Sequence, residues 1–472
     1  MQTNFSPEQL KKPGIDVAEK IIRNCVHCGF CTATCPTYKL LGDELDSPRG
    51  RIYLIKDMLE NDRDATEEVV RHVDRCLSCL SCMTTCPSGV HYMHLVDHAR
   101  SHIEKTYKRT GQDAFLRGLL ARLLPRPALF RLALLPARMM RPFRGLFAKN
   151  RTLERASAML NLAPKGRLPK TEFSAPLALK AEGFRNGRVV VMRGCAQQVL
   201  RPQINDASVR VLSRLGFEVI LSAGEGCCGS LTHHMGREED ALASAKRNID
   251  VWLAQADSAG LDAIIINASG CGTTVKDYGH MLRDDPQYAG KAERVAALAK
   301  DISEFLADFD IGPVELRSGL NVAYHSACSL QHGQQIRRQP KELLQSAGFV
   351  VHDVPEGHLC CGSAGTYNIL QPKIAKALRD RKVENIESVS PDLIATGNIG
   401  CITQIATGTQ IPIVHTIELL DWSMGGPRPK ELAKVKLPEP EAEEANMAED
   451  EIQIIKSEEE DTAETNKIAA AN

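Results

Sequence analysis

The 472-residue sequence lacks several features by which common classes of protein are identified. It has no run of about 18 uninterrupted apolar residues, so we expect no segment that crosses a membrane. Its first residues, MQTNFSPEQLKKPG, do not have the form of a signal peptide, and we therefore expect a cytoplasmic protein. No G-x-G-x-x-G motif opens a helix after a strand, which argues against bound FAD or NAD.

Cysteine, by contrast, is abundant. The 16 cysteines of a chain without a secretory signal favour metal ligation in a reducing compartment over a disulfide framework. The chain is too long for one hydrophobic core, and its length predicts two to four domains. The formal net charge of −1 hides an asymmetry, because residues 438–472 hold twelve Asp or Glu and only two Lys. The tail is therefore acidic and the rest of the chain basic.

Two short runs share the cysteine spacing C-x2-C-x2-C-x3-C followed by proline, CVHCGFCTATCP at 25–36 and CLSCLSCMTTCP at 76–87. Three thiolates on a tight loop can reach three irons of one [4Fe–4S] cube, and in two-cluster ferredoxins the fourth cysteine binds the other cluster. We therefore expect two [4Fe–4S] clusters. The ligands of one are Cys25, Cys28, Cys31 and Cys86, and those of the other are Cys76, Cys79, Cys82 and Cys35.

Structural zinc is the main alternative for these two runs. Zinc sites usually separate two cysteine pairs by a longer loop and need only four ligands. In both runs, by contrast, the third and fourth cysteines follow after spacers of only two and three residues, and a proline follows the fourth. This pattern favours clusters over zinc.

Residues 1–112 are predicted to form a mainly helical module around the clusters, because the segments beside the two runs have helical periodicity. Ser47 and Pro48 form a typical helix start, with the serine as the cap before a proline at the first helical position. Arg49 and Arg51 follow at once, and we expect them to be exposed or salt-bridged on a turn.

Residues 113–187 are predicted to connect this module to the rest of the chain. Residues 114–153 contain nine Lys or Arg and no acidic residue, interleaved with Leu, Phe and Met and broken by four prolines. This composition is typical of a segment on a membrane surface or partner subunit, and equally of a segment packed on its own protein. Because no aromatic stacking platform accompanies the charge, we expect no nucleic-acid partner. Residues 163–187 have the Pro, Gly and Lys content of a linker.

An internal duplication organises the sequence from residue 188 onward. In each copy 31 residues separate a first cysteine from a CC pair, and a final cysteine follows a later strand. We expect two α/β lobes, 188–312 and 313–425, with the cysteines at the carboxyl ends of parallel strands, where such sheets bind ligands. If the lobes face each other, all these thiols converge on one cleft. This second cysteine site comprises Cys195, Cys227, Cys228, Cys271, Cys328, Cys360, Cys361 and Cys401.

Two interpretations stay open for these eight cysteines. They are either inert core residues, or ligands of an additional cluster or a redox thiol site. The matched pattern favours a function, and Gly229 and Gly362 after the CC pairs would let the backbone approach a cluster closely. Among the histidines we single out His325, three residues before Cys328, as a candidate for proton handling.

The two cysteine runs and the duplicated CCG half resemble the family of glycolate oxidase iron–sulfur subunits. The resemblance covers nearly all of residues 20–420, including CVHCGFCTATCPTYKLLGDELDSPRGRIYLIK, DRCLSCLSCMTTCPSGV, GCCG and LCCGSAGTY. We therefore expect an α+β, multidomain protein, in which a mainly helical two-cluster ferredoxin-like domain is followed by two duplicated α/β CCG lobes.

The resemblance also implies an oxidoreductase subunit that transfers electrons and has no catalytic residues of its own. Flavin-containing subunits would oxidise glycolate to glyoxylate, and this chain would pass the electrons to the quinone pool or another membrane acceptor, as a peripheral protein on the inner face of the membrane. Iron–sulfur subunits of lactate, glycerol-3-phosphate and heterodisulfide oxidoreductases share the architecture, so the substrate stays open. A zinc-loaded, non-redox scaffold for the catalytic subunits is an alternative of another class.

The sequence departs from this resemblance in two places. CCG domains of the heterodisulfide reductase type often end in C-x-x-C, whereas Ala268 and Asn398 stand three residues before Cys271 and Cys401. Each copy thus lacks one thiol, which argues against a noncubane cluster of that type. The tail within residues 426–472 lies outside the resemblance and has the composition of a disordered extension.

Overall fold

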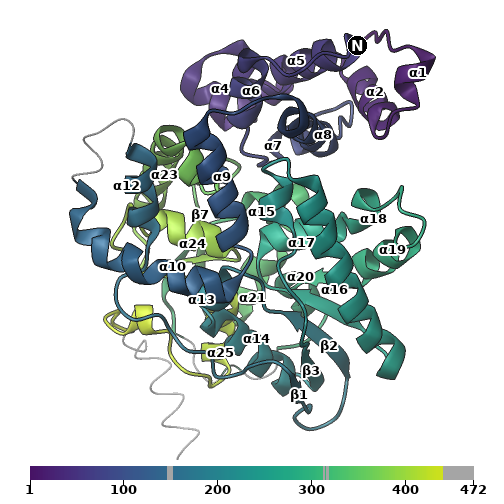
Figure 1. The fold of residues 1–472 in the computed structure, drawn as a ribbon. Helices are drawn as coiled ribbons and strands as arrows, with labels where there is room; N and C mark the ends of the chain where they lie inside the picture. Colours follow the sequence, from purple (N-terminus) through teal and green to yellow (C-terminus); the bar gives the residue numbers. More distant parts are fainter. Residues whose placement is uncertain (146–152, 312–313, 315–317, 439–472) are drawn as a thin grey trace, which may run out of the picture.

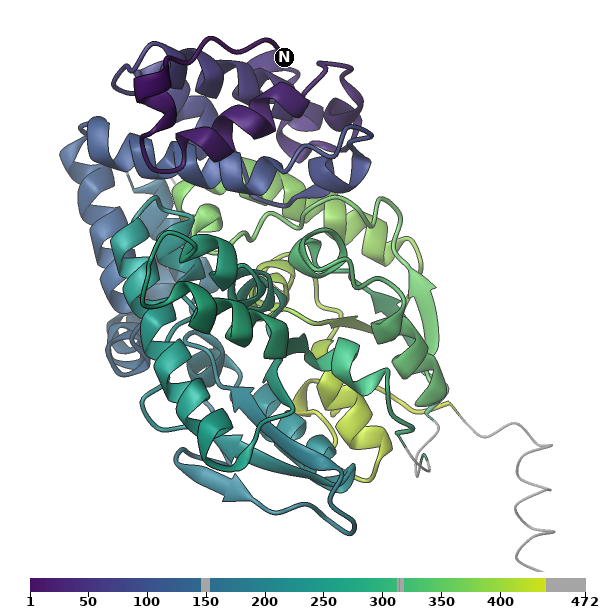
Figure 2. The same ribbon diagram turned by 90° about the vertical axis from the view of Figure 1, so that its right-hand side faces the viewer.

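The computed structural model describes residues 1–145, 153–311, 314 and 318–438 (Figure 1). A helical N-terminal module lies above two α/β lobes, which Figure 2 shows side by side beneath it. The predicted α+β class is confirmed, whereas the domain boundaries at 112, 187, 312 and 425 stay a prediction. The acidic stretch from residue 439 lies outside the described residues.

The N-terminal module consists of helices and loops. Its elements are α1 (Pro7–Leu10), α2 (Ile15–Asn24), α3 (Phe30–Thr34), α4 (Pro36–Leu41), η1 (Glu44–Asp46), α5 (Pro48–Glu60), α6 (Glu67–Asp74), α7 (Ser81–Thr85) and α8 (Tyr92–Thr106). These helices pack around a core that includes Ile22, Ile55, Val73 and Leu95. The predicted start of α5 is confirmed, because the Ser47 hydroxyl accepts a hydrogen bond from the Gly50 N–H at 3.0 Å.

Each lobe is built on a predominantly parallel sheet. The first lobe contains β1 (Leu177–Leu179), β2 (Gly187–Met192), α13 (Gln197–Leu200), α14 (Gln203–Arg214), β3 (Phe217–Leu221), α15 (Ser230–His233), α16 (Glu238–Ala259), β4 (Ala263–Ile266), α17 (Ser269–Lys276), α18 (Tyr278–Met281), α19 (Ala289–Leu298), β5 (Ala299–Asp301) and α20 (Ile302–Leu306). The second contains β6 (Asn321–Tyr324), the π-helical turn η3 (Ser329–Gly333), α21 (Gln339–Ser346), β7 (Val350–Asp353), α22 (Tyr367–Leu370), α23 (Pro372–Glu387), β8 (Leu393–Thr396), α24 (Ile399–Ile405), β9 (Ile413–His415), α25 (Thr416–Ser423) and η4 (Lys430–Leu432).

The strand order shows the internal duplication. The sheets run β1-β3-β2-β4-β5 and β7-β6-β8-β9, so the orders are the same once the edge strand β1 is set aside. All the shared pairs are parallel, and only β1 pairs antiparallel, with β3. The fourth strand of each copy, β5 or β9, was not predicted. Each leads into a helix that begins with a capping box, formed by Asp301 with Glu304 and by His415 with Glu418.

The two lobes share one apolar core, in which Val189 and Ile265 of the first lobe belong to the same cluster as Val322 and Ile394 of the second. Charged contacts support this packing, because Arg210 and Arg214 of α14 both pair with the buried Asp421 of α25, at 2.6 and 2.9 Å. The lobes also meet at their cysteine-bearing ends. There the Asn398 side-chain amide donates to the Ser269 hydroxyl at 2.7 Å.

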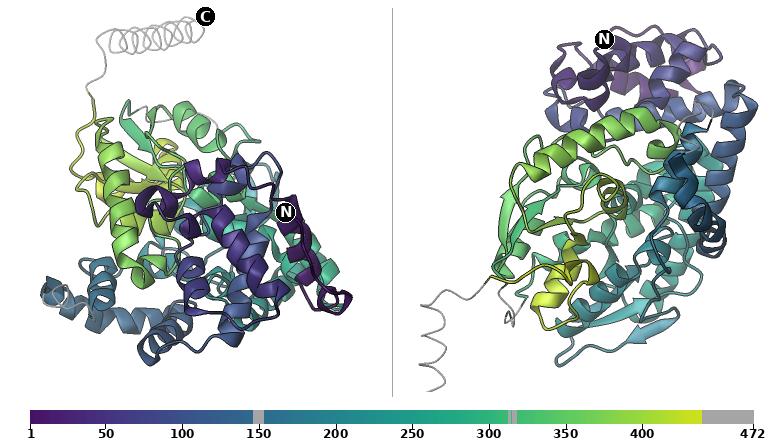
Figure 3. Two further views of the ribbon diagram at one scale, coloured as in Figure 1. Left: turned by 90° about the horizontal axis from the view of Figure 1, so that it is seen from above. Right: turned by 90° about the vertical axis from the view of Figure 1, so that its left-hand side faces the viewer.

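Helices α9 (Gly111–Leu123), α10 (Pro127–Met140) and α12 (Glu154–Leu162) lie along one side of the lobes, and η2 (Arg141–Phe143) follows α10 (Figures 1 and 3). Leu134 of α10 packs with Val199 of the first lobe, and α12 contacts α22 and α23 of the second. Residues 146–152 of the basic segment lie outside the described residues. Part of the predicted linker, Leu177–Leu179, is instead the edge strand β1. In the part of the chain that the structure describes, no helix is long and apolar enough to cross a bilayer.

Candidate metal centres

The two cysteine runs fold into loops with the same unusual backbone. In the first loop His27 and Gly29 have φ angles of 57° and 87°, and in the second the matching Ser78 and Leu80 have 48° and 62°. A leucine in the left-handed region is uncommon, so its surroundings hold it there. This repetition at the same cysteine spacing indicates the same ligand geometry in both loops.

The first run encloses a cavity together with the end of the second run. Cys25, Cys28 and Cys31 line this cavity, and Cys82 and Cys86 reach it from the other run. Helices α3 and α7 contact each other and bring the two runs together. Three thiols from one run and the fourth from the other match the ligand set expected for a [4Fe–4S] cube, and soft sulfur donors fit an iron–sulfur cluster.

Cys35, the last cysteine of the first run, lies among the cysteines of the second run. Burial raises the pKa of the Cys79 and Cys82 thiols, and nearby thiolates, including that of Cys35, raise it further. Burial likewise raises the pKa of Cys31 to about 11. Several thiols in one buried space cannot all lose their protons unless a cation compensates the charge, so both groups fit metal ligation.

Arg51 is not the exposed or turn residue that we expected. It lies inside α5, is 1% exposed, and its guanidinium donates to the His72 carbonyl at 2.7 Å and to the Thr37 hydroxyl at 3.0 Å. Its Nη1 is also 3.9 Å from the Cys35 sulfur. Arg49 does form the expected salt bridge, at 2.5 Å from Glu44.

A buried carboxylate compensates the charge of Arg51. Asp46 is fully buried, lies 3.4 Å from Arg51, and accepts from His72 Nδ1 at 2.9 Å and from Arg75 at 2.7 Å. Its backbone carbonyl accepts from the Thr37 hydroxyl at 2.8 Å. Cationic groups and hydrogen bonds near cluster sulfurs raise the reduction potential, so this network is placed to tune a cluster bound by Cys35.

The cysteines of the second half follow the carboxyl ends of neighbouring strands, as the sequence predicts. In the first lobe Cys195 follows β2, the CC pair follows β3, and Cys271 lies in α17 after β4. In the second lobe the corresponding cysteines follow β6, β7 and β8. The chain therefore brings four thiols to one edge of each sheet.

Glycines after both CC pairs are required by the backbone. Gly229 and Gly362 have φ angles of 91° and 85°, and a Cβ atom would lie 2.9 Å from the Ala241 carbonyl oxygen and 2.4 Å from that of Ala375. The loop that results points backbone N–H groups at the sulfurs. The Gly229 and Gly362 N–H groups donate to Cys227 and Cys360, both at 3.4 Å, which stabilises thiolates.

Contacts between sulfurs divide the eight thiols into two groups of four. In the first lobe Cys227 contacts both Cys195 and Cys228, and Cys228 contacts Cys271. In the second lobe the same chain of contacts joins the four equivalent thiols and ends in a Cys361–Cys401 distance of 3.4 Å. Each group has its own environment, because Cys195 packs in the core of the first lobe and Cys328 packs against the N-terminal module.

His325 lies beside the second group. One of its ring nitrogens and the sulfurs of Cys361 and Cys401 all lie within 4.8 Å of one another. Burial and, to a lesser extent, the charge of Lys382 lower the pKa of His325 to about 3. The ring is therefore neutral at physiological pH, which does not favour the proton-handling role that we considered.

The second lobe lies directly against the second cysteine run. Leu77 and Cys79 of the module pack in one cluster with Cys328 and Cys360 of the lobe. The Tyr367 hydroxyl donates to the Arg75 carbonyl at 2.9 Å across the same interface. Sequence analysis did not anticipate this contact, because no local pattern indicates which lobe faces which cysteine run.

Comparisons with known proteins agree with this geometry. A model of the 4Fe–4S dicluster domain matches residues 21–90, and a model of the cysteine-rich domain matches residues 189–276 and 322–406. The glycolate oxidase iron–sulfur subunit of Escherichia coli is 43% identical over 424 residues, which cover 90% of this chain and 99% of that protein.

Two further relatives are more distant. A probable glycolate oxidase iron–sulfur subunit of Bacillus subtilis is 30% identical and covers 84% of this chain and 93% of its own. Lactate utilization protein A of Bacillus subtilis is 26% identical, and its match covers 96% of that protein but only 48% of this chain. With its dicluster module and two cysteine-rich lobes, the chain belongs to the family of glycolate oxidase iron–sulfur subunits.

Proposed function

We propose that this chain is the electron-transfer subunit of a glycolate dehydrogenase complex. In this complex a flavin-containing subunit oxidises glycolate to glyoxylate, and this chain carries the electrons to a membrane acceptor such as a quinone. The observation that supports the proposal is the succession of cysteine sites. The Cys28 cavity opens near the surface, the group around Cys79 lies deeper, and Cys79 packs in one cluster with Cys328 of the second lobe.

When bound, [4Fe–4S] clusters supply one-electron steps that divide the two-electron oxidation of a hydroxy acid. The residues of this chain hold the clusters and set their surroundings. The first cavity is lined by thiols from both runs, and Arg51 places a buried positive charge beside Cys35. Leu77 and Cys79 pack in the apolar cluster between the module and the second lobe.

The surface at the first cavity is suited to receive the electron donor. Val26 and Phe30, on either side of the exposed Cys28, are 66% and 60% exposed. Exposed apolar side chains of this size commonly mark protein interfaces. We assign this surface to the flavin-containing subunit, because it places the donor next to the most accessible thiol.

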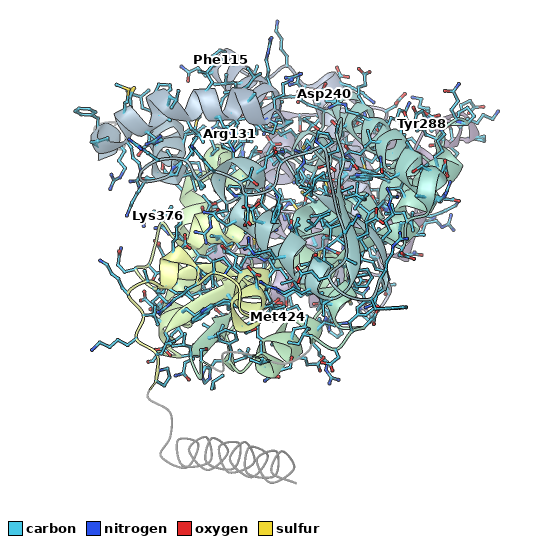
Figure 4. All side chains as sticks on the ribbon, turned by 90° about the horizontal axis from the view of Figure 1, so that it is seen from below. Phe115, Arg131, Asp240, Tyr288, Lys376 and Met424 are labelled. Atoms are coloured by element: carbon cyan, nitrogen blue, oxygen red, sulfur yellow. The ribbon has the colours of Figure 1, made fainter. Side chains whose placement is uncertain are left out.

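A second surface is suited to the membrane. On α10 and η2 the side chains of Leu132, Leu135, Met139 and Phe143 are at least 50% exposed, although Leu134 on the opposite face of α10 is buried. Figure 4 shows Phe115 and Arg131, which belong to α9 and α10, on the same side of the molecule. Apolar side chains interleaved with arginine bind the interface of anionic membranes. We therefore assign this face to peripheral contact with the membrane that holds the acceptor.

Two alternatives have their own support. The lactate utilization relatives make lactate the second candidate substrate, although their match covers only half of this chain. Thiolate sites also bind zinc, which would make the subunit a scaffold without redox activity.

The function is tested with the anaerobically assembled complex carrying Cys79→Ser. We expect glycolate to reduce the flavin at the normal rate while electron transfer to a quinone falls at least tenfold. Ala33→Ser, on the exposed surface of α3, is the matched control and leaves both steps unchanged. Normal quinone reduction by Cys79→Ser would contradict the proposal, as would zinc in place of iron in active complex. Flavin reduction by lactate but not by glycolate would move the assignment to the second substrate.

The membrane contact has a separate test. Binding to vesicles that contain phosphatidylglycerol should weaken in the double variant Leu132→Glu, Met139→Glu, and it should weaken for the unaltered chain as salt is added. Val350→Glu alters an exposed apolar residue of β7 in the second lobe and serves as the control. Equal binding of all three proteins would show that α10 does not contact the membrane.

A further inference from the structure

His325 is a buried histidine whose ring has no hydrogen-bond partner in the described part of the chain. The residue follows β6, is 1% exposed, and donates its backbone N–H to the Ala395 carbonyl at 2.9 Å. Neither Nδ1 nor Nε2 has a partner among the residues that the structure describes. Buried polar groups without a partner are rare and costly, so the ring requires an explanation.

Other buried histidines of the chain show what a structural role looks like. His415 donates from Nε2 to the Asn267 carbonyl at 2.9 Å and accepts the Ile417 N–H at Nδ1 at 3.1 Å. His72 bonds to Asp46 at 2.9 Å, and His332 bonds to Thr84 at 2.7 Å. Each of these rings stabilises a helix start or an interface, whereas the His325 ring does neither.

What lies beside the His325 ring is sulfur. A ring nitrogen and the sulfurs of Cys361 and Cys401 are within 4.8 Å of one another, and the two sulfurs are 3.4 Å apart. Cys328 and Cys360 continue the group of thiols. Imidazole nitrogen and thiolate sulfur together are donors typical of zinc and of iron–sulfur centres.

The two lobes differ at this position. Counting three residues back from the first cysteine of each copy places Met192 in the first lobe where His325 stands in the second. The second lobe also lacks the thiol of a C-x-x-C ending, because Asn398 occupies that position. The Asn398 side chain is used elsewhere, since it accepts the Gly400 N–H at 2.7 Å and donates to Ser269. Asn398 is therefore not available as a fifth donor in the second lobe.

We propose that His325 is a nitrogen ligand of an iron–sulfur centre in the second lobe, which it holds together with Cys328, Cys360, Cys361 and Cys401. Iron is favoured over zinc because Cys328 and Cys360 pack against Cys79 of the dicluster module, so a redox centre here would lie next to an electron carrier. The inference deepens the proposed function and rests on it for the choice of iron, but the ligand set stands on the contacts of this lobe alone.

Nitrogen ligation has a direct spectroscopic test on the isolated, anaerobically purified full chain. The two dicluster sites offer only thiolates, so a strongly coupled nitrogen nucleus in pulsed EPR of the reduced protein must come from another centre. We expect such a coupling in the unaltered chain. When the histidines carry ¹⁵N, the size of the coupling should change by the ratio of the gyromagnetic ratios of the two nitrogen isotopes. Iron should exceed the roughly eight per chain that two cubes hold.

Two variants complete the design. His325→Ala should lose the nitrogen coupling and part of the iron, and His325→Cys should retain the iron, lose the coupling and shift the centre to a lower potential, as expected when thiolate replaces imidazole. His352→Ala, in β7 of the same lobe, is the control and should keep both signals.

The proposal is overturned if ¹⁵N-histidine leaves the spectrum unchanged, if the coupling survives in His325→Ala, or if the second lobe holds zinc. None of these measurements involves glycolate or a partner subunit. A failure of the ligand assignment is therefore distinguishable from a failure of the proposed function, which would appear as normal quinone reduction by Cys79→Ser.

Discussion

Cys79 of the N-terminal module and Cys328 of the second lobe lie in one apolar cluster, although they belong to separate parts of the sequence. The negative charge of a Cys328 thiolate is one of the main influences that raise the pKa of Cys79. The second cysteine run and the second lobe are therefore electrostatic neighbours. Changing the charge of one site should change the reduction potential of the other.

The first prediction concerns the buried guanidinium beside Cys35. Replacing it in Arg51→Met removes a positive charge 3.9 Å from that sulfur, and the potential of the second cluster should fall by tens of millivolts, an order-of-magnitude expectation. The variant should also lose about 3 kcal/mol of stability, because Asp46 stays buried with fewer partners. EPR-monitored redox titration measures the shift. Arg49→Met removes an arginine that pairs with Glu44, and it should leave the second cluster unchanged.

A second prediction concerns the glycine after the second CC pair. In Gly362→Ala the new Cβ would lie 2.4 Å from the Ala375 carbonyl, at a φ of 85°. We expect a loss of about 1–3 kcal/mol of stability and less metal in the second lobe. Gly42→Ala also has a positive φ, 68°, in the left-handed region, but nothing lies within 4 Å of its Cβ. If the two variants have the same melting temperature and metal content, the close approach at Gly362 is not important.

The third prediction concerns pH. Burial is the main cause that lowers the pKa of His415 from 6.5 to about 4, and the charge of Arg201 contributes, whereas the hydrogen bond to the Asn267 carbonyl opposes the shift. A histidine with a lowered folded-state pKa binds its proton more readily when unfolded, so stability is lost as the pH falls from about 6.5 to about 4. This residue alone should cost about 2 kcal/mol between pH 7 and pH 5.

Trp422 lies in the helix that His415 caps, so its fluorescence can follow urea unfolding at the two pH values. In His415→Asn the amide oxygen can keep the cap, and we expect a smaller difference between pH 7 and pH 5 than in the unaltered chain. The partly buried His352 provides the control, His352→Asn. An undiminished pH dependence in His415→Asn would show that other groups cause it.

A fourth prediction concerns the contact between the lobes. Asn398→Ala removes the cap of α24 and the hydrogen bond to Ser269, and it should cost about 1–2 kcal/mol. Ser269→Ala keeps the cap and removes two bonds between the lobes, to Asn398 and to the Ser329 hydroxyl at 2.7 Å, whereas Asn398→Ala removes three bonds, so Ser269→Ala should cost less. Thermal unfolding of both variants under anaerobic conditions measures the difference. Equal losses would show that the bonds of Ser269 between the lobes, and not the cap, are the important contacts.

Much of the fold follows from local patterns in the sequence. The cysteine spacing indicates the two loops. In both runs the residues two and four positions after the first cysteine have positive φ angles. The duplicated positions of the CC pairs correspond to the duplicated strand order. The start of α5 can be predicted from two residues alone, the capping Ser47 and the proline at the first helical position, Pro48.

Other features depend on residues that only the fold brings together. Arg51 is buried because Asp46, His72 and Thr37 surround it, and none of these partners forms a recognisable pattern with it. Leu177–Leu179 forms a strand because the exposed edge of β3 is available, which the composition of that segment does not indicate. His325 was singled out for its position before Cys328, but its lack of any hydrogen-bond partner is visible only in the folded chain.

The exchange of the fourth cysteine between the two runs has a consequence for biosynthesis. The first cavity is lined by Cys25, Cys28 and Cys31 and is completed by Cys86. A nascent chain that has emerged from the ribosome only as far as residue 75 therefore offers three thiols for this cluster and one for the next. In the proposed ligand sets each cube takes thiols from both runs, so neither cube could be completed before the second run has been translated.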